Sequence, residues 1–333
     1  MKAFVTGGTG FIGRHLVRRM SRTKHEMVCL VRETSDSKEL EELGAQLVIG
    51  DVTDRDSLRD GMNGCDWLLN LANVYSYWER EKYRYKSVNI EGTRNVLECA
   101  LEAGISKVVH VSTVVVYGKP KESPFSEESA VGPLRFSEYA RSKYEGDLIA
   151  WDLYKERGLP LVMIYPGAVL GSGDASISGA SIDRFIHHKL PATVFNKSVM
   201  TYVHVQDVAE AILKAAEMSN NIGEKYIVGN TKLTFDEFYN MLGELSGVSR
   251  PLMSMPGSLA LFNASILTFL ANVTKRPPLW GMSTDAMRAL KEGCNADGSK
   301  AEQELGFSYS PIRDALKDEV EWYRDPSHSH YSK

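Results

Sequence analysis

A glycine-rich turn at the start of the chain is the sequence feature that most restricts its fold. The segment "VTGGTGFIG" holds Gly7, Gly10 and Gly13, follows a short apolar run and opens a stretch with helical spacing. In a strand–turn–helix unit, the first glycine allows a tight turn, the second lets the backbone approach a pyrophosphate, and the third lets the helix pack on the strand. The N–H groups at the start of that helix bind the diphosphate. The segment therefore predicts a dinucleotide-binding unit.

Apolar runs alternate with helical stretches through the first half of the chain. The predicted strands include "MVCLVR" (27–32), "AQLVIGD" (45–51), "DWLLNLA" (66–72) and "SKVVHVST" (106–113), and 89–104 is an amphipathic helix. Continuous Val/Ile/Leu strands, each followed by a helix, imply a parallel sheet covered on both faces, and right-handed crossovers make it doubly wound. We expect an α/β fold with a Rossmann sheet and a smaller, mostly helical C-terminal substrate domain.

The pattern loosens after residue 166, where Gly and Ser become frequent. We expect a dinucleotide-binding domain over 1–166, to which 200–230 returns. The substrate-binding domain is then 167–199 with 231–325, and 326–333 is a flexible tail. Two tail histidines, His328 and His330, are weak metal-ligand candidates, and we expect no metal site.

Composition excludes several classes of protein. The net charge of −4 and the lack of a long basic run argue against nucleic acid as a partner. The four scattered cysteines, without any CxxC pair, predict free buried thiols in a reducing compartment. The N-terminus leads directly into "MKAFVTGG" without an apolar signal segment, so we expect a cytoplasmic protein.

One apolar stretch, 252–273, has the length of a membrane-spanning helix. Pro256, Asn263, Asn272 and several hydroxyl side chains interrupt it. We therefore expect helices that cover a ligand pocket in preference to peripheral membrane contact, with a true span least favoured.

The end of the second predicted strand indicates which nicotinamide cofactor binds. An acidic residue there would accept hydrogen bonds from the ribose 2′-hydroxyl and repel a 2′-phosphate. Arg32 occupies this place, with Arg14 and Lys38 as further candidates, and a guanidinium suits a phosphate. Glu33 is the one feature against this assignment. We expect NADP in preference to NAD.

The end of the third strand, "GDVTD", indicates contacts with the adenine. Asp51 is a candidate partner of the adenine amino group, and Val52 is a candidate to line the ring. Asp54 fits a cap of the following helix.

The segment "YARSK" places a phenol and an ammonium four residues apart. Tyr139 and Lys143 lie in a helix-compatible run, where positions i and i+4 share a face. The lysine charge would favour the phenolate and lower a pKa that is about 10 when unperturbed. Tyr117 and Lys121 have the same spacing, but Pro120 prevents a helical turn between them.

A hydroxyl is also needed to hold the substrate oxygen. The strand "VVHVST" brings Ser112 and Thr113 to the carboxyl edge of the sheet, beside the crevice in which such sheets hold ligands.

Together, the glycine loop, the strand-end hydroxyl and the Tyr-x-x-x-Lys pair resemble the extended branch of the short-chain dehydrogenase/reductase superfamily, also described as the NAD-dependent epimerase/dehydratase family. The resemblance extends over most of the chain, through "TGGTGFIG", "GDVTD", "NIEGTRNVLECA", "VSTVVVYG", "YARSK", "YVHVQDVAEA" and "SKAEQELGF". It implies that Tyr139 is the general acid/base and that Lys143 binds the nicotinamide ribose and tunes Tyr139. Thr113 becomes the third catalytic residue, with Ser112 as the alternative.

The motifs and the resemblance predict a full set of site residues. The predicted cofactor-binding residues are Gly7, Thr9, Gly10, Phe11, Ile12, Gly13, Arg32, Lys38, Asp51, Val52, Leu71, Ala72, Asn73, Tyr139, Lys143, Tyr165, Pro166, Gly167 and Val169. The predicted substrate contacts are Tyr75, Trp78, Thr113 and Tyr202. His204 is expected to be a framework histidine and Asp207 to cap the helix that follows it.

The resemblance permits several reactions. Nucleotide-sugar members tend to carry an arginine and an asparagine where this chain has Tyr165 and Ala168, within "YPGAVLG". The segments "MVCLVRETSD" and "YPGAVLGSGD" are similar to the dihydroflavonol reductase and aldehyde reductase group. We expect an NADP-dependent oxidoreductase that reduces an aldehyde or ketone of hydrophobic or aromatic character.

Three alternatives stay open: an NAD-dependent nucleotide-sugar epimerase or dehydratase, a 3β-hydroxysteroid dehydrogenase/isomerase, and a non-catalytic NADP-sensing regulator. The resemblance also implies a homodimer formed through 89–103 and 138–156.

Overall fold

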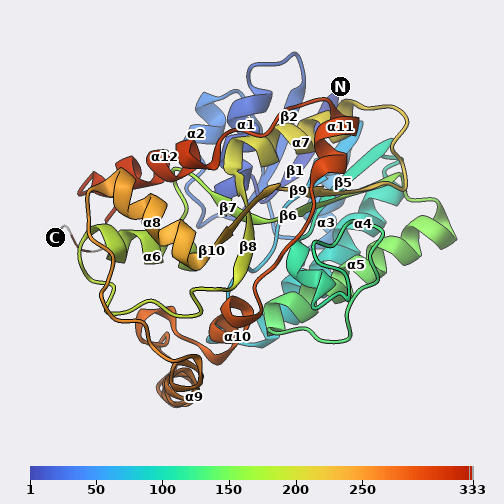
Figure 1. Ribbon diagram of the computed structural model, residues 1–333. Helices are drawn as coiled ribbons and strands as arrows, with labels where there is room; N and C mark the ends of the chain where they lie inside the picture. The colour runs from blue at the N-terminus through green and yellow to red at the C-terminus, as the bar shows by residue number, and fades with distance from the viewer. Residues whose placement is uncertain (330, 332–333) are drawn as a thin grey trace.

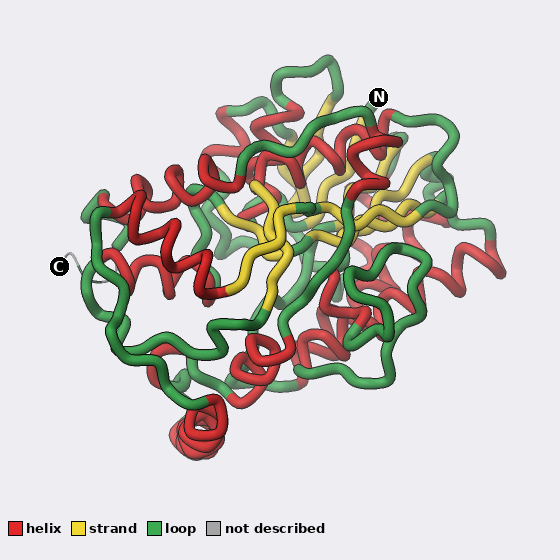
Figure 2. The backbone as a smooth tube through the Cα atoms, in the orientation of Figure 1, coloured by secondary structure: helices red, strands yellow, loops and turns green. Residues whose placement is uncertain are grey.

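A seven-stranded sheet with all strands parallel forms the centre of the molecule, as the computed structural model of residues 1–329 and 331 shows (Figures 1 and 2). In spatial order its strands are β3 (Gln46–Ile49), β2 (Glu26–Val31), β1 (Lys2–Thr6), β4 (Trp67–Asn70), β5 (Lys107–Val111), β6 (Leu161–Pro166) and β9 (Lys225–Val228). The order reverses direction between β1 and β4. This arrangement confirms the predicted doubly wound Rossmann sheet.

Helices cover both faces of the large sheet. One face carries α1 (Phe11–Met20), α7 (Val205–Glu217) and α11 (Ser299–Leu305). The other carries α3 (Arg55–Met62), α4 (Thr93–Glu102) and α5 (Glu138–Arg157), while the short helix α2 (Lys38–Glu42) connects β2 and β3. Because both faces are covered, the strands read as continuous apolar runs.

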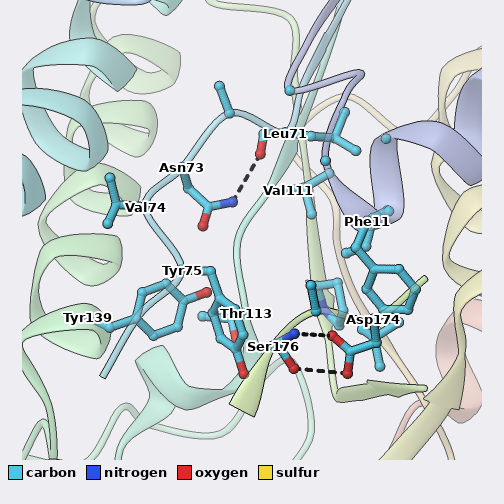
Figure 3. A pocket seen from close by; sticks show the side chains of 18 of the residues that line it. Phe11, Leu71, Asn73, Val74, Tyr75, Val111, Thr113, Tyr139, Asp174 and Ser176 are labelled. Carbon is cyan, nitrogen blue, oxygen red and sulfur yellow. Dashed lines mark hydrogen bonds between the residues drawn. The ribbon is translucent and has the colours of Figure 1, made fainter. Parts of the chain in front are cut away.

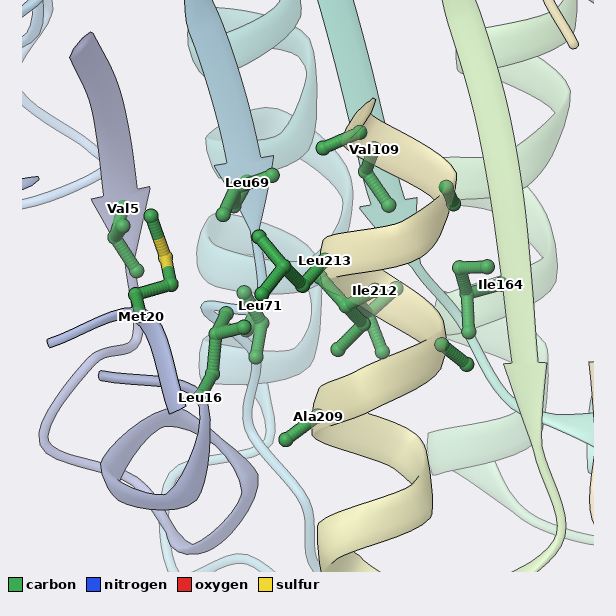
Figure 4. Close-up of a cluster of buried hydrophobic side chains, with 14 of the residues drawn as sticks. Val5, Leu16, Met20, Leu69, Leu71, Val109, Ile164, Ala209, Ile212 and Leu213 are labelled. Atoms are coloured by element: carbon green, nitrogen blue, oxygen red, sulfur yellow. The ribbon is translucent and has the colours of Figure 1, made fainter. Parts of the chain in front are cut away.

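The core on the first face is formed mainly by α7 and α1. Figure 4 shows Ile212 and Leu213 of α7 pointing at the sheet beside Leu69 of β4, with Leu16 of α1 nearby. All four side chains are fully buried. Burying a side chain of this size contributes roughly 1.5–3 kcal/mol, so this contact holds α7 on the sheet.

The predicted helix 89–104 differs from expectation at its start. A π-helical segment, η1 (Tyr85–Gly92), leads directly into α4. There the Asn89 side chain accepts a hydrogen bond from Val74 N (2.7 Å) and donates one to Ser142 Oγ (2.9 Å). A π-helical turn often marks a functional site, and here it ties the loop after β4 to helix α5.

A second, smaller lobe is built on a three-stranded sheet. Its strands, in order, are β10 (Thr231–Thr234), β8 (Val199–His204) and β7 (Ala168–Leu170), packed with α6 (Ile177–Ile186), α8 (Phe235–Ser246) and α12 (Ile312–Arg324). The expected return of 200–230 to the large sheet is therefore only partly correct. Strand β8 pairs with β7 and β10, whereas α7 and β9 rejoin the Rossmann unit.

The remaining elements lie at the lower edge of Figure 1, with α9 (Gly257–Thr274) outermost and α10 (Thr284–Glu292) between it and the body. Short 3₁₀ turns, η2 (Val114–Tyr117) and η3 (Leu279–Gly281), follow β5 and precede α10. Within the described residues, α9 is the one helix long and apolar enough to cross a membrane by length and composition, and 17% of it is buried.

The predicted flexible tail packs against the small lobe over 326–329. His328 stacks on Trp322 with 3.5 Å between ring centroids, and the buried Ser329 donates a hydrogen bond to Asp183. His330 lies outside the described residues. In the part of the chain that the structure describes, no three His, Cys, Asp or Glu side chains are grouped to hold a metal ion.

The cysteines are as predicted. All four, Cys29, Cys65, Cys99 and Cys294, are buried free thiols.

We predict that Leu213→Ala lowers the free energy of unfolding by about 2–5 kcal/mol, because it leaves a cavity between α7 and the sheet. Urea unfolding followed by circular dichroism measures the change. Ile222→Ala, at an exposed position, is the control and should change stability by less than about 0.5 kcal/mol. Equal effects of the two substitutions would contradict this account of the core.

Candidate active site

The glycine turn lies where the strand order reverses, between the carboxyl ends of β1 and β4. Gly7 has a φ of +72°, and a Cβ there would lie 2.8 Å from the backbone nitrogen of Ala72. Only glycine fits this close approach without strain. Helix α1 then begins at Phe11 with no side-chain cap from a described residue and no acidic residue in its first turn. Its free N–H groups and positive end suit a diphosphate.

A cavity of about 810 Å³ extends along this edge of the sheet from the glycine turn. Most of the predicted cofactor-binding residues line it: Gly7, Thr9, Gly10, Phe11, Ile12, Gly13, Arg32, Asp51, Val52, Leu71, Ala72, Asn73, Tyr139, Pro166, Gly167 and Val169. The glycine cradle and the uncapped helix end therefore fit a nicotinamide dinucleotide. These lining residues would bind it.

The three basic side chains that were predicted near the end of β2 differ in their partners. Arg32 lines the cavity, is exposed, and forms no side-chain hydrogen bond or ion pair with any residue that the structure describes. Arg14 is held by Glu39 (2.9 Å). Lys38 pairs with Glu42 and is not among the described residues that line the cavity, so the structure does not support its predicted role in cofactor binding. Helix α2 turns Lys38 outward, which leaves Arg32 as the available cation.

At the end of β3, Asp51 and Val52 line the cavity as predicted. Asp51 Oδ1 accepts hydrogen bonds from the backbone and side chain of Thr53, which fixes the carboxylate. Asp54 accepts from Asp56 N and caps α3, which confirms the predicted cap.

Tyr139 lies in the first turn of α5, whose start is capped by Ser137. Figure 3 shows its ring reaching into the cavity toward Tyr75 and Thr113. The rings of Tyr75 and Tyr77 lie 5.0 and 6.1 Å from it, each edge to face. Burial raises the pKa of Tyr139, the neighbouring Tyr77 adds to the rise, and the Thr113 hydroxyl lowers it. The phenol is thus protonated at neutral pH.

Lys143 lies one turn further along α5 and is buried. Its Nζ donates a hydrogen bond to the carbonyl oxygen of Val111, at the end of β5, over 2.9 Å. Burial lowers the pKa of Lys143, and Asp147 raises it. In this structure burial is the largest influence on the pKa of Tyr139 and raises it, while the Lys143 ammonium is directed toward the strand end. The predicted lowering of that pKa by the lysine stays a prediction.

The two hydroxyl side chains that follow β5 have different partners. Ser112 Oγ donates to Asp147 Oδ2 over 2.7 Å, so this hydroxyl is engaged beneath the cavity. Thr113 lines the cavity and lies beside the phenol of Tyr139. This geometry favours Thr113 over Ser112 as the hydroxyl that meets a substrate.

Asp147 is a site residue that the sequence reasoning missed. It is buried behind Lys143, and burial raises its pKa to about 7, while Lys143 and Ser112 lower it. Its Oδ1 faces His110 Nε2 at 3.8 Å, and Asn70 contacts His110 Nδ1 at 2.8 Å. The i, i+4 spacing that relates Tyr139 to Lys143 continues to Asp147 and was the signal for it.

The far end of the cavity is apolar and aromatic. Tyr75, Tyr77, Ile177, Met200 and Leu290 line it together with Val115. Tyr77 was missed because nothing in the loop sequence distinguishes it from its neighbours. Asp174 also lines this end, where its carboxylate accepts from Ser176 (Figure 3).

Three predicted contacts lie elsewhere. Tyr165 is buried beneath the cavity beside Tyr117, and it lies against Asp147. Tyr202 stacks on Phe238 in the small lobe, with 5.1 Å between ring centroids. Because each ring packs into a buried aromatic cluster, neither is among the described residues that line the cavity, and their predicted contacts with a ligand are wrong. Trp78 lines a neighbouring cavity of about 460 Å³ and donates to Asn272 of α9.

His204 and Asp207 are structural. His204 Nδ1 accepts from Gln206 N and so caps α7, which is the predicted framework role. Asp207 instead accepts hydrogen bonds from the backbone and hydroxyl of Ser310, ahead of α12. Helix α7 is therefore capped by His204 and not, as predicted, by Asp207.

Comparison with known proteins identifies the family. The family model described as "NAD dependent epimerase/dehydratase family" matches residues 3–229. The chain belongs to this epimerase/dehydratase family. Its members include NAD(P)-dependent reductases, epimerases and dehydratases, in line with the extended short-chain dehydrogenase/reductase pattern predicted from the motifs.

Relatives of this family member cover nearly all of it. A putative dihydroflavonol 4-reductase of Synechocystis sp. is 31% identical over 97% of this chain and 94% of its own. The sterol demethylase protein B of Methylococcus capsulatus is 30% identical over 98% of this chain and 99% of its own. A crystal structure described as that of gox2253 matches with a TM-score of 0.85 at 31% identity, over 98% and 99% of the two chains.

We predict that Asp147→Asn changes the pH dependence of stability of this epimerase/dehydratase-family protein. In the unfolded chain Asp147 ionises near pH 4, whereas the folded protein retains the proton to about pH 7. Folded-state stability due to this group is therefore lost as the pH rises through that window.

The asparagine variant cannot ionise, so its unfolding free energy relative to wild type should increase between about pH 4 and about pH 7 and stay level above. Urea unfolding over this pH range measures the difference. A pH-independent difference would contradict the assigned burial of the charge.

Proposed function

We propose that this protein is an NADP-dependent carbonyl reductase that converts an aldehyde or ketone of aromatic or hydrophobic character to its alcohol. One observation carries the proposal. The buried phenol of Tyr139, beside Thr113, lies in one cavity with the glycine cradle at one end and an apolar, aromatic wall at the other. A proton donor is thus held between a dinucleotide site and a space suited to an apolar substrate.

In the proposed reaction, the Thr113 hydroxyl donates a hydrogen bond to the carbonyl oxygen and orients it toward Tyr139. The Tyr139 hydroxyl then transfers its proton to that oxygen as the alcohol forms. A nicotinamide cofactor, when bound, would supply the hydride for the carbonyl carbon. Lys143 would hold its ribose, and Asp147 raises the pKa of Lys143, which favours the charged form of the buried ammonium.

The lining of the cavity supports the choice of substrate class. Among the described basic residues that line the main cavity, Arg14 is paired with Glu39 and Arg84 with Glu79 (3.1 Å). Arg32 lies at the opposite end, after β2. The apolar end therefore offers stacking and dispersion contacts with Tyr75 and Tyr77, and its described lining residues include no unpaired cation.

A nucleotide-sugar epimerase is the second candidate, and one observation favours it. The smaller cavity next to Tyr75 and Tyr77 is lined by Arg80 and Arg184. Neither guanidinium forms an ion pair with a residue that the structure describes, and two such groups suit a diphosphate. That reaction would use the dinucleotide without net oxidation.

Incubation with NADPH and a panel of aromatic aldehydes, ketones and dihydroflavonols distinguishes the two candidates, with nucleotide sugars run beside them on NAD. Steady oxidation of NADPH by a carbonyl compound supports the reductase. Interconversion of a nucleotide sugar without net change in NAD supports the epimerase and rejects the reductase. Tight NADPH binding without turnover of any compound would indicate a regulator, and conversion of a 3β-hydroxysteroid would favour the steroid-dehydrogenase alternative.

We predict that Tyr139→Phe lowers turnover by about a hundredfold or more, because the proton donor is removed. Binding of NADPH, followed by its fluorescence, should change little. Tyr117→Phe is a matched control, since Tyr117 has the same sequence relation to a lysine but donates its hydroxyl to Glu127 O away from the cavity. Unchanged turnover in the Tyr139 variant would remove the catalytic assignment.

We predict that Arg32→Ala weakens NADPH binding about tenfold or more and leaves NADH binding nearly unchanged, since only the former has a 2′-phosphate. Isothermal titration with each cofactor measures the two affinities. Lys38→Ala should affect neither, because Lys38 points outward and pairs with Glu42. An equal loss for both cofactors in the Arg32 variant would reject the phosphate contact.

A further inference from the structure

Helix α9 buries small side chains and exposes large apolar ones, which is the reverse of an ordinary surface helix. The side chains that it buries are the small Ala260, Ala264 and Ala271. Its large apolar side chains face solvent, and Phe262 and Phe269 are 63% and 67% exposed. A helix that served only to cover a pocket would bury its phenylalanines, because these gain most from leaving water.

The exposed apolar surface continues beyond the helix at both ends. Leu252 and Met253 precede α9, Leu279 and Trp280 follow it, and all four are exposed. We call these residues, with the outward face of α9, the α9 surface. Figure 1 shows α9 as the outermost element at the lower edge, separated from the large sheet by α10. Contiguous exposed apolar surface of this kind marks an interaction site.

The charges within the segment that forms the α9 surface are of one sign. Residues 251–284 contain no Asp or Glu, and their only charged side chains are Lys275 and Arg276 at the C-terminal end of α9. Both are exposed, and neither forms an ion pair with a described residue. An apolar helix face bordered by basic side chains and a tryptophan matches the interface of a bilayer with anionic lipids.

Contacts along its length fix α9 flat against the protein. Asn272 accepts a hydrogen bond from Trp78 (3.0 Å), and Thr268 accepts one from Thr284 N (2.8 Å). Before the helix, Thr193 N donates to Met253 O, and Met255 N donates to Thr193 O. These contacts hold α9 against the protein along its length, which favours an orientation in the plane of a bilayer over a span.

We propose that the α9 surface binds the interfacial region of an anionic membrane, with α9 lying in the plane of the bilayer. Its phenylalanines then enter the acyl boundary, and Lys275 and Arg276 contact lipid phosphates. A second copy of the chain is the other conceivable occupant. A two-fold contact would place two such basic pairs at one interface whose own segment, 251–284, supplies no acidic partner.

The location has a consequence for the substrate, and this step rests on the proposed function. Pro277, Pro278 and Gly281, between α9 and α10, line the smaller cavity together with Trp78. That cavity shares Tyr75 and Tyr77 with the main one. A bilayer under α9 would therefore lie beside the smaller cavity, which adjoins the cavity of Tyr139, and a bilayer concentrates a lipophilic carbonyl compound.

Vesicle co-sedimentation of the full chain tests the proposal. Phosphatidylcholine vesicles with and without phosphatidylglycerol are the probes, and no substrate or cofactor is added, so the result is independent of the proposed reaction. We expect the wild type to sediment with the anionic vesicles. The double variant Phe262→Gln/Phe269→Gln should reduce the bound fraction about tenfold or more. Leu134→Gln/Ile222→Gln, which removes two exposed apolar side chains elsewhere, is the matched control and should bind like wild type.

A charge variant and a folding check complete the test. Lys275→Glu/Arg276→Glu should lose the preference for anionic vesicles, since the electrostatic attraction is reversed. Thermal unfolding should match wild type for every variant, because the substituted side chains are exposed. Wild-type protein that stays in the supernatant overturns the proposal, and so does a dimer in size-exclusion chromatography that dissociates in the phenylalanine variant without any vesicle binding.

Discussion

The close approach of the glycine turn to the chain leaving β4 is the constraint on which the site depends. Gly7 lies so near Ala72 that a side chain would collide with the backbone, and the Thr6 hydroxyl accepts a hydrogen bond from Ala72 N (3.1 Å). This contact fixes the ends of β1 and β4 together at the point where the strand order reverses. It also aims the uncapped start of α1 into the cavity and sets the path of the loop that carries Tyr75 to Tyr139.

Burial then determines what the polar groups can do. The raised pKa keeps Tyr139 protonated at neutral pH but makes its phenol a weaker acid, so proton donation depends on groups that lower this pKa, such as the Thr113 hydroxyl. Behind it, Lys143 is held between the end of β5 and Asp147, a carboxyl that is itself tied to Ser112. The network positions the ammonium beneath the cavity floor, so any effect of Lys143 on the phenol depends on what binds above it.

Local sequence signals predicted the fold and most of the residues that line the dinucleotide end of the cavity. The glycine turn, the apolar strands and the Tyr139–Lys143 spacing each depend on a few neighbouring residues. Tyr165 and Tyr202 were misplaced because a continuous apolar strand does not reveal which of its residues face the ligand. Likewise, the composition of 252–273 predicted a helix near the pocket but not that its alanines would face inward and its phenylalanines outward. Packing against α10 determines which face of the helix is buried.

A crystal structure of the protein with NADP⁺ bound tests the central claim most directly. Our account predicts the diphosphate at the start of α1, the 2′-phosphate at Arg32, and the nicotinamide within contact of the Tyr139 hydroxyl, with Lys143 at its ribose. A cofactor bound in the opposite direction, or with its nicotinamide out of reach of Tyr139, would contradict the assignment of the phenol as proton donor.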